Sequence, residues 1–103
     1  MNDALNKAKK FVVRLKNDGV AVESAFLFGS YAKGNQHKDS DIDVCIVSSK
    51  FGKDYLDEMV DLRMKALKID IRIEPIPFTP TDLSDPYSSL ATEIRNTGVP
   101  ITL

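Results

Sequence analysis

The chain has 103 residues, with 14 Lys and Arg against 15 Asp and Glu, and a net charge of -1. Its composition, 43% hydrophobic and 28% charged, excludes a disordered chain and predicts one domain over residues 1–103. The near-neutral charge argues against direct binding to nucleic acid or to a membrane surface. One cysteine excludes an internal disulfide and no stretch approaches a membrane span, so we expect a cytoplasmic protein.

Periodic patterns in the first half of the chain predict helices and strands that follow one another closely. Apolar residues at spacings of three and four predict an amphipathic helix over 3–16. The Val- and Phe-rich segment 20–28 predicts a strand buried on both faces, and 30–33 predicts a helical turn. Residues 41–47 alternate strictly and predict a second strand with two distinct faces.

A longer helix is predicted after a polar linker. Asp54 can cap its first turn, and the pattern extends to about Lys68. The expected buried face carries Leu56, Met59, Val60, Arg63 or Met64, and Leu67.

The last third of the chain predicts one more strand and one more helix. Residues 69–73 alternate between Ile and charged side chains and predict a third strand, which Pro75 and Pro77 would end. A final helix is expected over 86–98, followed by a short edge strand over 99–103. This order of elements predicts an α/β (α+β) fold in which helices cover a small mixed sheet.

Two aspartates lie two positions apart at the start of the second predicted strand. Asp41 and Asp43 would point to the same side, with Cα atoms roughly 6 to 7 Å apart, so both can reach one metal site. Their mutual repulsion would be relieved by a cation, and Mg²⁺ prefers such hard oxygen ligands. The alternative is that both carboxylates face solvent on a half-exposed strand.

A glycine and a serine follow the first predicted strand. Gly29 permits a turn with positive φ and a close approach of the backbone to a ligand, and Ser30 begins a helical turn whose free N–H groups favour phosphate. Lys33, one turn later, can neutralise a phosphate oxygen. The alternative is an ordinary corner between a strand and a helix.

The spacing of these motifs resembles that of a known superfamily. Gly29-Ser30, ten residues, and then Asp41-Ile42-Asp43 are similar to the signature of nucleotidyltransferases with the DNA polymerase β palm fold. The sequences Gly-Ser-Tyr-Ala-Lys-Gly at 29–34 and Ser-Asp-Ile-Asp-Val at 40–44 resemble the motifs of its smallest members, the minimal nucleotidyltransferases. The resemblance implies that Gly29 and Ser30 hold nucleotide phosphates, and that Asp41 and Asp43 bind two Mg²⁺ ions.

The resemblance also implies a third metal-binding carboxylate on a later strand. Asp70 best matches the apolar-Asp-apolar pattern and is the predicted ligand, with Glu74 as the reserve because both would share one strand face. The alternative for Asp70 is a salt bridge with Arg72 or a lysine.

The function implied by the resemblance is a Mg²⁺-dependent nucleotidyltransferase that moves AMP from ATP to a hydroxyl. The minimal members resemble antitoxins that modify a small helical HEPN-type toxin, so a partner protein of that kind is expected to bring the acceptor. The competing hypothesis is a non-catalytic nucleotide-binding antitoxin or regulatory module that acts by contact alone. A homodimer is also expected, because so small a domain leaves a sheet edge and apolar surface to cover.

Overall fold

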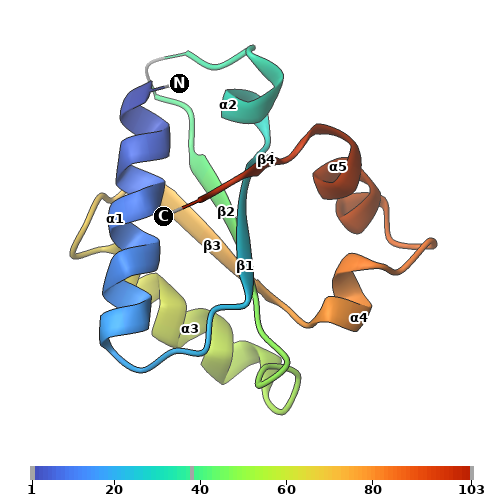
Figure 1. Ribbon diagram of the computed structural model, residues 1–103. Coiled ribbons are helices and arrows are strands. Elements are labelled where there is room, and N and C mark those ends of the chain that lie inside the picture. The colour runs from blue at the N-terminus through green and yellow to red at the C-terminus, as the bar shows by residue number, and fades with distance from the viewer. Residues whose placement is uncertain (1, 38, 103) are drawn as a thin grey trace.

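A four-stranded mixed sheet forms the centre of the computed structural model, which describes residues 2–37 and 39–102 (Figure 1). In spatial order the strands are β3 (Ile73–Phe78), β2 (Ile42–Val47), β1 (Ser24–Phe28) and β4 (Val99–Pro100). β1 pairs antiparallel with both β2 and β4, whereas β2 and β3 run parallel. The sheet and its covering helices confirm the predicted fold class.

Helices lie on both faces of this sheet (Figure 1). They are α1 (Asn2–Asn17), α2 (Ser30–Lys33), α3 (Tyr55–Ala66), α4 (Pro80–Leu83) and α5 (Ser89–Thr97). α1 and α3 share one hydrophobic cluster with the sheet, and α4 and α5 share another on the opposite face. Within the described ranges, no helix is long and apolar enough to cross a membrane.

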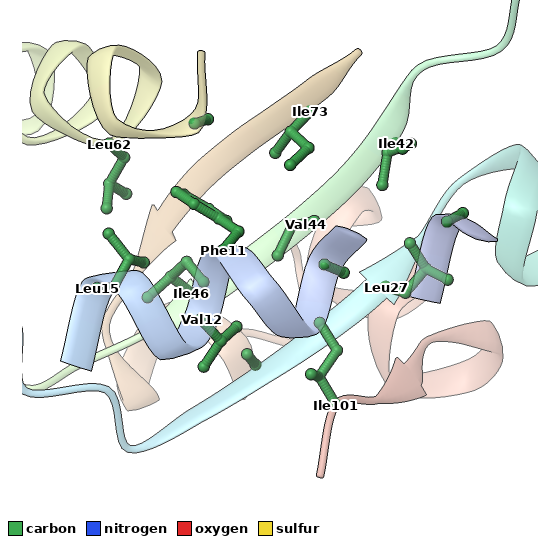
Figure 2. Close-up of a cluster of buried hydrophobic side chains, with 14 of the residues drawn as sticks. Phe11, Val12, Leu15, Leu27, Ile42, Val44, Ile46, Leu62, Ile73 and Ile101 are labelled. Atoms are coloured by element: carbon green, nitrogen blue, oxygen red, sulfur yellow. The ribbon is translucent and has the colours of Figure 1, made fainter. Parts of the chain in front are cut away.

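The main core lies between the sheet and the first of these helix layers (Figure 2). Phe11 and Leu15 of α1 pack there with Val44 and Ile46 of β2 and with Leu62 of α3. Alternate residues of β2 point to the opposite face, where Cys45 and Val47 join Ile94 of α5. Each such aliphatic side chain contributes roughly 1.5–3 kcal/mol on burial. The predicted two-faced strand over 41–47 is therefore confirmed from residue 42 onward.

The third strand differs from its prediction. Residues 69–73 lie mostly in turns, and β3 begins at the end of that segment and continues through Pro75 and Pro77. The N–H of Ile42 donates to the carbonyl of Arg72. With this pairing, the backbone N–H and C=O groups of the even-numbered residues of β3 point toward β2. The backbone nitrogens of both prolines therefore point to the free edge of the sheet, where a missing N–H removes no hydrogen bond between strands.

The buried face of α3 also differs from the one predicted. Leu62 and Ala66 are buried against the core, while Leu56, Val60 and Met64 are exposed. The helix carries two apolar stripes, and the stripe that ends in small Ala66 is the one buried against the core. The stripe chosen from the sequence is left at the surface.

The predicted final helix begins at Ser89 instead of Pro86, and a short helix that was not predicted precedes it. α4 begins after Thr79, whose hydroxyl accepts from the N–H of Asp82, and α5 begins after Ser88, whose hydroxyl accepts from the N–H of Ala91. Two serine or threonine caps thus start two helices, where the prediction placed a single start at Asp85. The end of the second helix at Gly98 is confirmed.

Candidate functional site

The turn after β1 lies directly against a carboxylate of β2. Gly29 has φ 75° and ψ -148°, a conformation that only glycine adopts readily. A Cβ atom at Gly29 would lie 2.1 Å from Oδ2 of Asp43. Phe28, the residue before the turn, is the register partner of Asp43. The absence of a side chain at Gly29 is therefore what allows the turn to pack directly against the Asp43 carboxylate.

The segment that follows this turn is a single helical turn, α2. Ser30 is its first residue, and the N–H of Lys33 donates to the carbonyl of Gly29 at 3.1 Å. Gly34 ends it in the left-handed conformation at φ 78°. The predicted turn over 30–33 is confirmed.

Several charged groups act on Asp43. Burial, followed by the negative charges of Asp41, Glu74 and Glu93, raises the pKa of Asp43 to about 6, while Lys33 opposes the shift. The structure thus gathers four acidic side chains from three segments of the chain at one end of the sheet. Such a group is unfavourable for the protein alone at neutral pH and favours a bound cation.

Two of the carboxylates that act on Asp43, Asp41 and Glu74, occupy different positions around it. Asp41 is exposed and lies just before β2, so it flanks the strand instead of belonging to it. Glu74 is the register partner of Asp43 on β3. Its Oε1 lies 2.5 Å from Nη1 of Arg63, in an ion pair between β3 and α3.

Lys33 forms an ion pair with a residue of the acidic group that the sequence did not indicate. Its Nζ is 3.3 Å from Oε1 of Glu93, in the middle of α5. No pattern around Glu93 marks it, because it occupies an ordinary helical position far along the chain. Only the packing of α5 over β1 and β2 brings it to Lys33.

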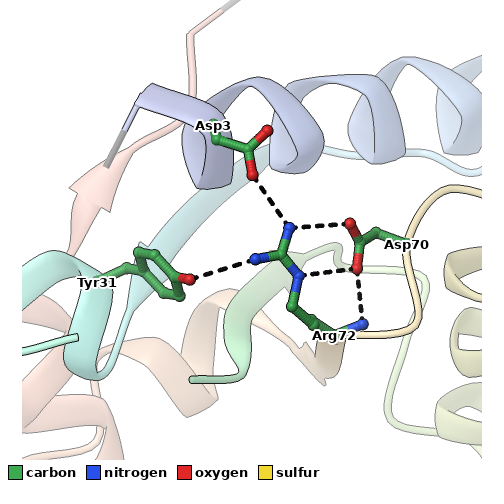
Figure 3. A network of polar contacts seen from close by, with 4 residues as sticks. All are labelled: Asp3, Tyr31, Asp70 and Arg72. Atoms are coloured by element: carbon green, nitrogen blue, oxygen red, sulfur yellow. Dashed lines mark hydrogen bonds and ion pairs between the residues drawn. The ribbon is translucent and has the colours of Figure 1, made fainter. Parts of the chain in front are cut away.

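Asp70 lies in a separate network (Figure 3). Its Oδ1 accepts from the backbone N–H of Arg72 at 2.9 Å and from Nε of Arg72 at 3.1 Å, and its Oδ2 accepts from Nη2 at 3.0 Å. The same guanidinium contacts Asp3 at 3.0 Å and the hydroxyl of Tyr31 at 3.4 Å. The structure therefore shows the salt bridge weighed as the alternative for Asp70, and it does not bring Asp70 into the group around Asp43.

This network should stabilise the fold in a pH-dependent way. Hydrogen bonds from Arg72 hold the pKa of Asp70 below its usual value. The stabilisation is present above the unfolded-state pKa of about 3.9 and is lost as pH falls through the lower folded-state value. We expect Asp70→Asn to lower the free energy of unfolding by about 1–2 kcal/mol at pH 7 and by much less at pH 3, measured by urea denaturation.

The control for this prediction is Asp18→Asn. Asp18, just after α1, pairs with Arg14 in its last turn at 3.0 Å, and the loss of this surface pair should cost only a few tenths of a kcal/mol. An Asp70→Asn penalty that is the same at pH 3 and pH 7 would contradict the ionic explanation.

The acidic group fits a divalent cation by its chemistry. Asp41, Asp43 and Glu74 offer only carboxylate oxygens, which Mg²⁺ prefers, and their mutual repulsion is relieved when a cation binds. In the part of the chain that the structure describes, no three His, Cys, Asp or Glu side chains already form a group that could hold a metal ion. A third ligand therefore requires a side-chain rearrangement, and Glu74 would have to leave Arg63.

The chain is thus an α/β domain in which a Gly-Ser turn packs against Asp43 at the end of a mixed sheet. The model of one protein family, described as a nucleotidyltransferase domain, matches residues 5–96. This chain therefore belongs to the nucleotidyltransferase domain family. No curated protein sequence matches it.

Solved structures share its fold. A toxin-antitoxin crystal structure with AMP-PNP has a TM-score of 0.67 and 21% identity, over 91% of this chain and 72% of that chain. A mutant of the toxin-antitoxin MntA-HpeT has a TM-score of 0.66 and 20% identity, over 90% and 70%. A nucleotidyltransferase from Sulfolobus solfataricus, described as putative, has a TM-score of 0.69 and 20% identity, over 95% and 78%. At these identities the likeness extends to the fold.

Proposed function

We propose that this chain transfers AMP from ATP to a hydroxyl of a partner protein, a HEPN-type toxin, and so acts as its antitoxin. The observation that carries the transfer is the contact of the Gly29 turn with Asp43, because the turn that would hold the phosphates and the carboxylates that would hold the cations then lie side by side. Membership of the nucleotidyltransferase family and the fold shared with toxin-antitoxin structures support the same reading.

The nucleotide phosphates would be held by the Gly29 turn and α2. Backbone N–H groups at this turn and the hydroxyl of Ser30 are donors of the kind that phosphate oxygens accept. Lys33 would leave its ion pair with Glu93 and contribute positive charge to the same phosphates. Because that pair is partly exposed, its loss costs little.

Asp41 and Asp43 would hold two Mg²⁺ ions, with Glu74 as the third carboxylate. Glu74 takes precedence over Asp70 in this proposal because it is the register partner of Asp43 and raises its pKa, whereas Asp70 is bound by Arg72. When bound, the ions would neutralise phosphate charge and lower the pKa of the acceptor hydroxyl.

In the transfer step the acceptor oxygen forms a bond to the α-phosphorus of ATP. The bond from that phosphorus to the oxygen bridging to the β-phosphate breaks, pyrophosphate leaves, and the hydroxyl proton is lost. Asp41 and Asp43 would remain deprotonated while they hold the ions, so the hydroxyl proton would pass to water. Most of the rate enhancement would come from positioning and electrostatic stabilisation.

A second candidate is a contact-only antitoxin that binds nucleotide without transferring it. One observation favours it: the side chains of Glu74 and Asp70 are both engaged by arginines, so the third carboxylate is not ready in place. The two candidates differ in whether the partner becomes labelled.

The experiment compares Glu74→Gln with Asp70→Asn. Each variant is incubated with Mg²⁺, α-labelled ATP and a HEPN-type protein encoded by a neighbouring reading frame. We expect Glu74→Gln to retain ATP binding and to lose transfer by a factor of at least ~100, because electrostatic support for the attacking oxygen is removed. Asp70→Asn should transfer within a few-fold of the unsubstituted protein at a temperature where both are folded.

The reverse result, an inactive Asp70→Asn and an active Glu74→Gln, would exchange the two assignments and leave the enzyme in place. Unsubstituted protein that neutralises its partner without labelling it would establish the contact-only antitoxin.

A further inference from the structure

One side of α3 carries a continuous apolar stripe that the fold leaves uncovered. Its members recur at spacings of four, four and three residues and share one face of the helix: Leu56 (66% exposed), Val60 (52%), Met64 (59%) and Leu67 (44%), the last at the C-terminal cap. Ile71, in the turn that follows, is 73% exposed. An aligned stripe of this kind on so small a domain is typical of an interaction surface.

The stripe borders a cleft between α3 and the edge strand β3, two elements that pack against each other (Figure 1). The cleft has a volume of about 270 Å³, and its lining consists of Met59, Val60, Arg63, Met64, Glu74 and Pro75. Two of these are methionines, whose flexible side chains adapt to different contacts. Most of the remaining wall is apolar, apart from the ion pair of Arg63 with Glu74.

One side chain belongs both to the lining of this cleft and to the proposed catalytic group. Glu74 lines the cleft and is also the register partner of Asp43 on the neighbouring strand. A protein segment that occupied the cleft would therefore lie next to the carboxylates that the proposed transfer uses. The acceptor hydroxyl has to reach these carboxylates, so the cleft is a direct route for it.

The surroundings of the stripe restrict what can bind there. β3 offers no N–H groups at Pro75 and Pro77 along its free edge, which disfavours the addition of another strand. A helix laid along α3 needs no backbone partners and fits a stripe with this spacing. Asp61 is paired with Lys65 at 2.9 Å, whereas Asp57 is exposed in the first turn of α3 and favours a basic residue at that end of the visiting helix.

We propose that the α3 stripe and its cleft form the docking surface for an amphipathic helix of the acceptor protein, with an apolar face and a basic residue at one end. The inference rests on the proposed function, since it assigns the acceptor of that reaction to this face. Docking there delivers the hydroxyl to the site from the side of Glu74, opposite the α5 side on which Lys33 and Glu93 lie.

The test uses the full chain and the neighbouring HEPN-type protein as the binding probe. Val60→Lys and Met64→Lys place a charge on the stripe and leave the phosphate turn, Asp41 and Asp43 unchanged. Val13→Lys is the matched control, because Val13 is also an exposed aliphatic residue of a helix, at 43% exposure, but lies on α1. Calorimetry gives the dissociation constant for the probe and for ATP, and labelled ATP gives KM for the acceptor.

We expect both stripe variants to weaken probe binding by about 30-fold or more, as loss of a central interface residue does, and to raise KM for the acceptor. ATP binding should be unchanged, and Val13→Lys should match the unsubstituted protein. If the probe binds and loses affinity in the stripe variants but is never labelled, the docking surface holds and the proposed transfer fails.

Three results would overturn the docking proposal. One is probe binding within two- to three-fold of normal in both stripe variants, whether or not transfer occurs. Another is no probe binding by the unsubstituted protein at tens of micromolar. The third is a homodimer, seen by sedimentation, that the stripe variants abolish without changing KM for the acceptor, which would assign the stripe to a second copy of this chain.

Discussion

Asp43→Asn is expected to abolish transfer and, at the same time, to stabilise the protein in the absence of metal. The carboxylate is half-buried beside other acids, and its pKa is raised to about 6, so the charged form at pH 7 is held in an unfavourable place. Each pKa unit corresponds to about 1.4 kcal/mol, and solvent screening at a half-exposed group reduces the sum to about 1–2 kcal/mol.

The sign of this effect depends on pH. A raised pKa contributes stability below the unfolded-state value of about 3.9, and that contribution is lost as pH rises through about 6. The advantage of Asp43→Asn over the unsubstituted protein should therefore be absent at pH 4 and full above pH 7. Urea denaturation across this range measures it, and the labelled-ATP assay measures transfer.

Two controls make the prediction specific to a cation site. Asp41→Asn should also abolish transfer but change stability less, because Asp41 is exposed. Added Mg²⁺ should raise the melting temperature of the unsubstituted protein and not that of Asp43→Asn. Full transfer by either variant would contradict the two-ion proposal. A stability difference between Asp43→Asn and the unsubstituted protein that is the same at pH 7 and pH 4 would contradict the raised pKa of Asp43.

Gly29→Ala is expected to have the second largest effect. The backbone at Gly29, with φ 75° and ψ -148°, lies in a region essentially confined to glycine, which costs about 1–3 kcal/mol for any other residue. The new Cβ would also displace Asp43, because its ideal position is 2.1 Å from Oδ2. We expect lower stability, at least tenfold weaker ATP binding and loss of transfer.

Gly19→Ala separates the two causes. Gly19 also has a positive φ, of 88°, but an added Cβ would meet nothing within 4 Å, so this variant tests backbone conformation without displacement. Combining Gly29→Ala with Asp43→Ala removes the overlapping oxygen and should restore part of the stability. ATP-dependent transfer should not be restored. Normal ATP binding by Gly29→Ala alone would show that the turn is not the phosphate site.

The sequence by itself determined the features that depend on local pattern. The alternation in β2, the amphipathic stripe of α1 and the glycine turn before α2 are each encoded within a few neighbouring residues, and each is found where it was predicted. The proximity of Gly29 and Asp43 also follows from local order, because two adjacent antiparallel strands bring the end of one to the start of the other.

Only the tertiary structure shows that Asp70 and Glu74 occupy different places. Both fit a strand that alternated over 69–73, but the parallel pairing with β2 starts the strand at Ile73 and makes Glu74 the register partner of Asp43. Asp70 remains in the preceding turn, where Arg72 binds it. Register is a property of two strands together, and so no pattern within one of them specifies it.

The same physical reason accounts for the other differences. Pro75 and Pro77 are acceptable because β3 is an edge strand, which depends on the order of all four strands. The buried side of α3 depends on which of its two apolar stripes is packed into the core, and the place of Glu93 depends on how α5 crosses the sheet. Burial and long-range contact depend on the partner as well as the residue, so a single segment of sequence cannot specify them.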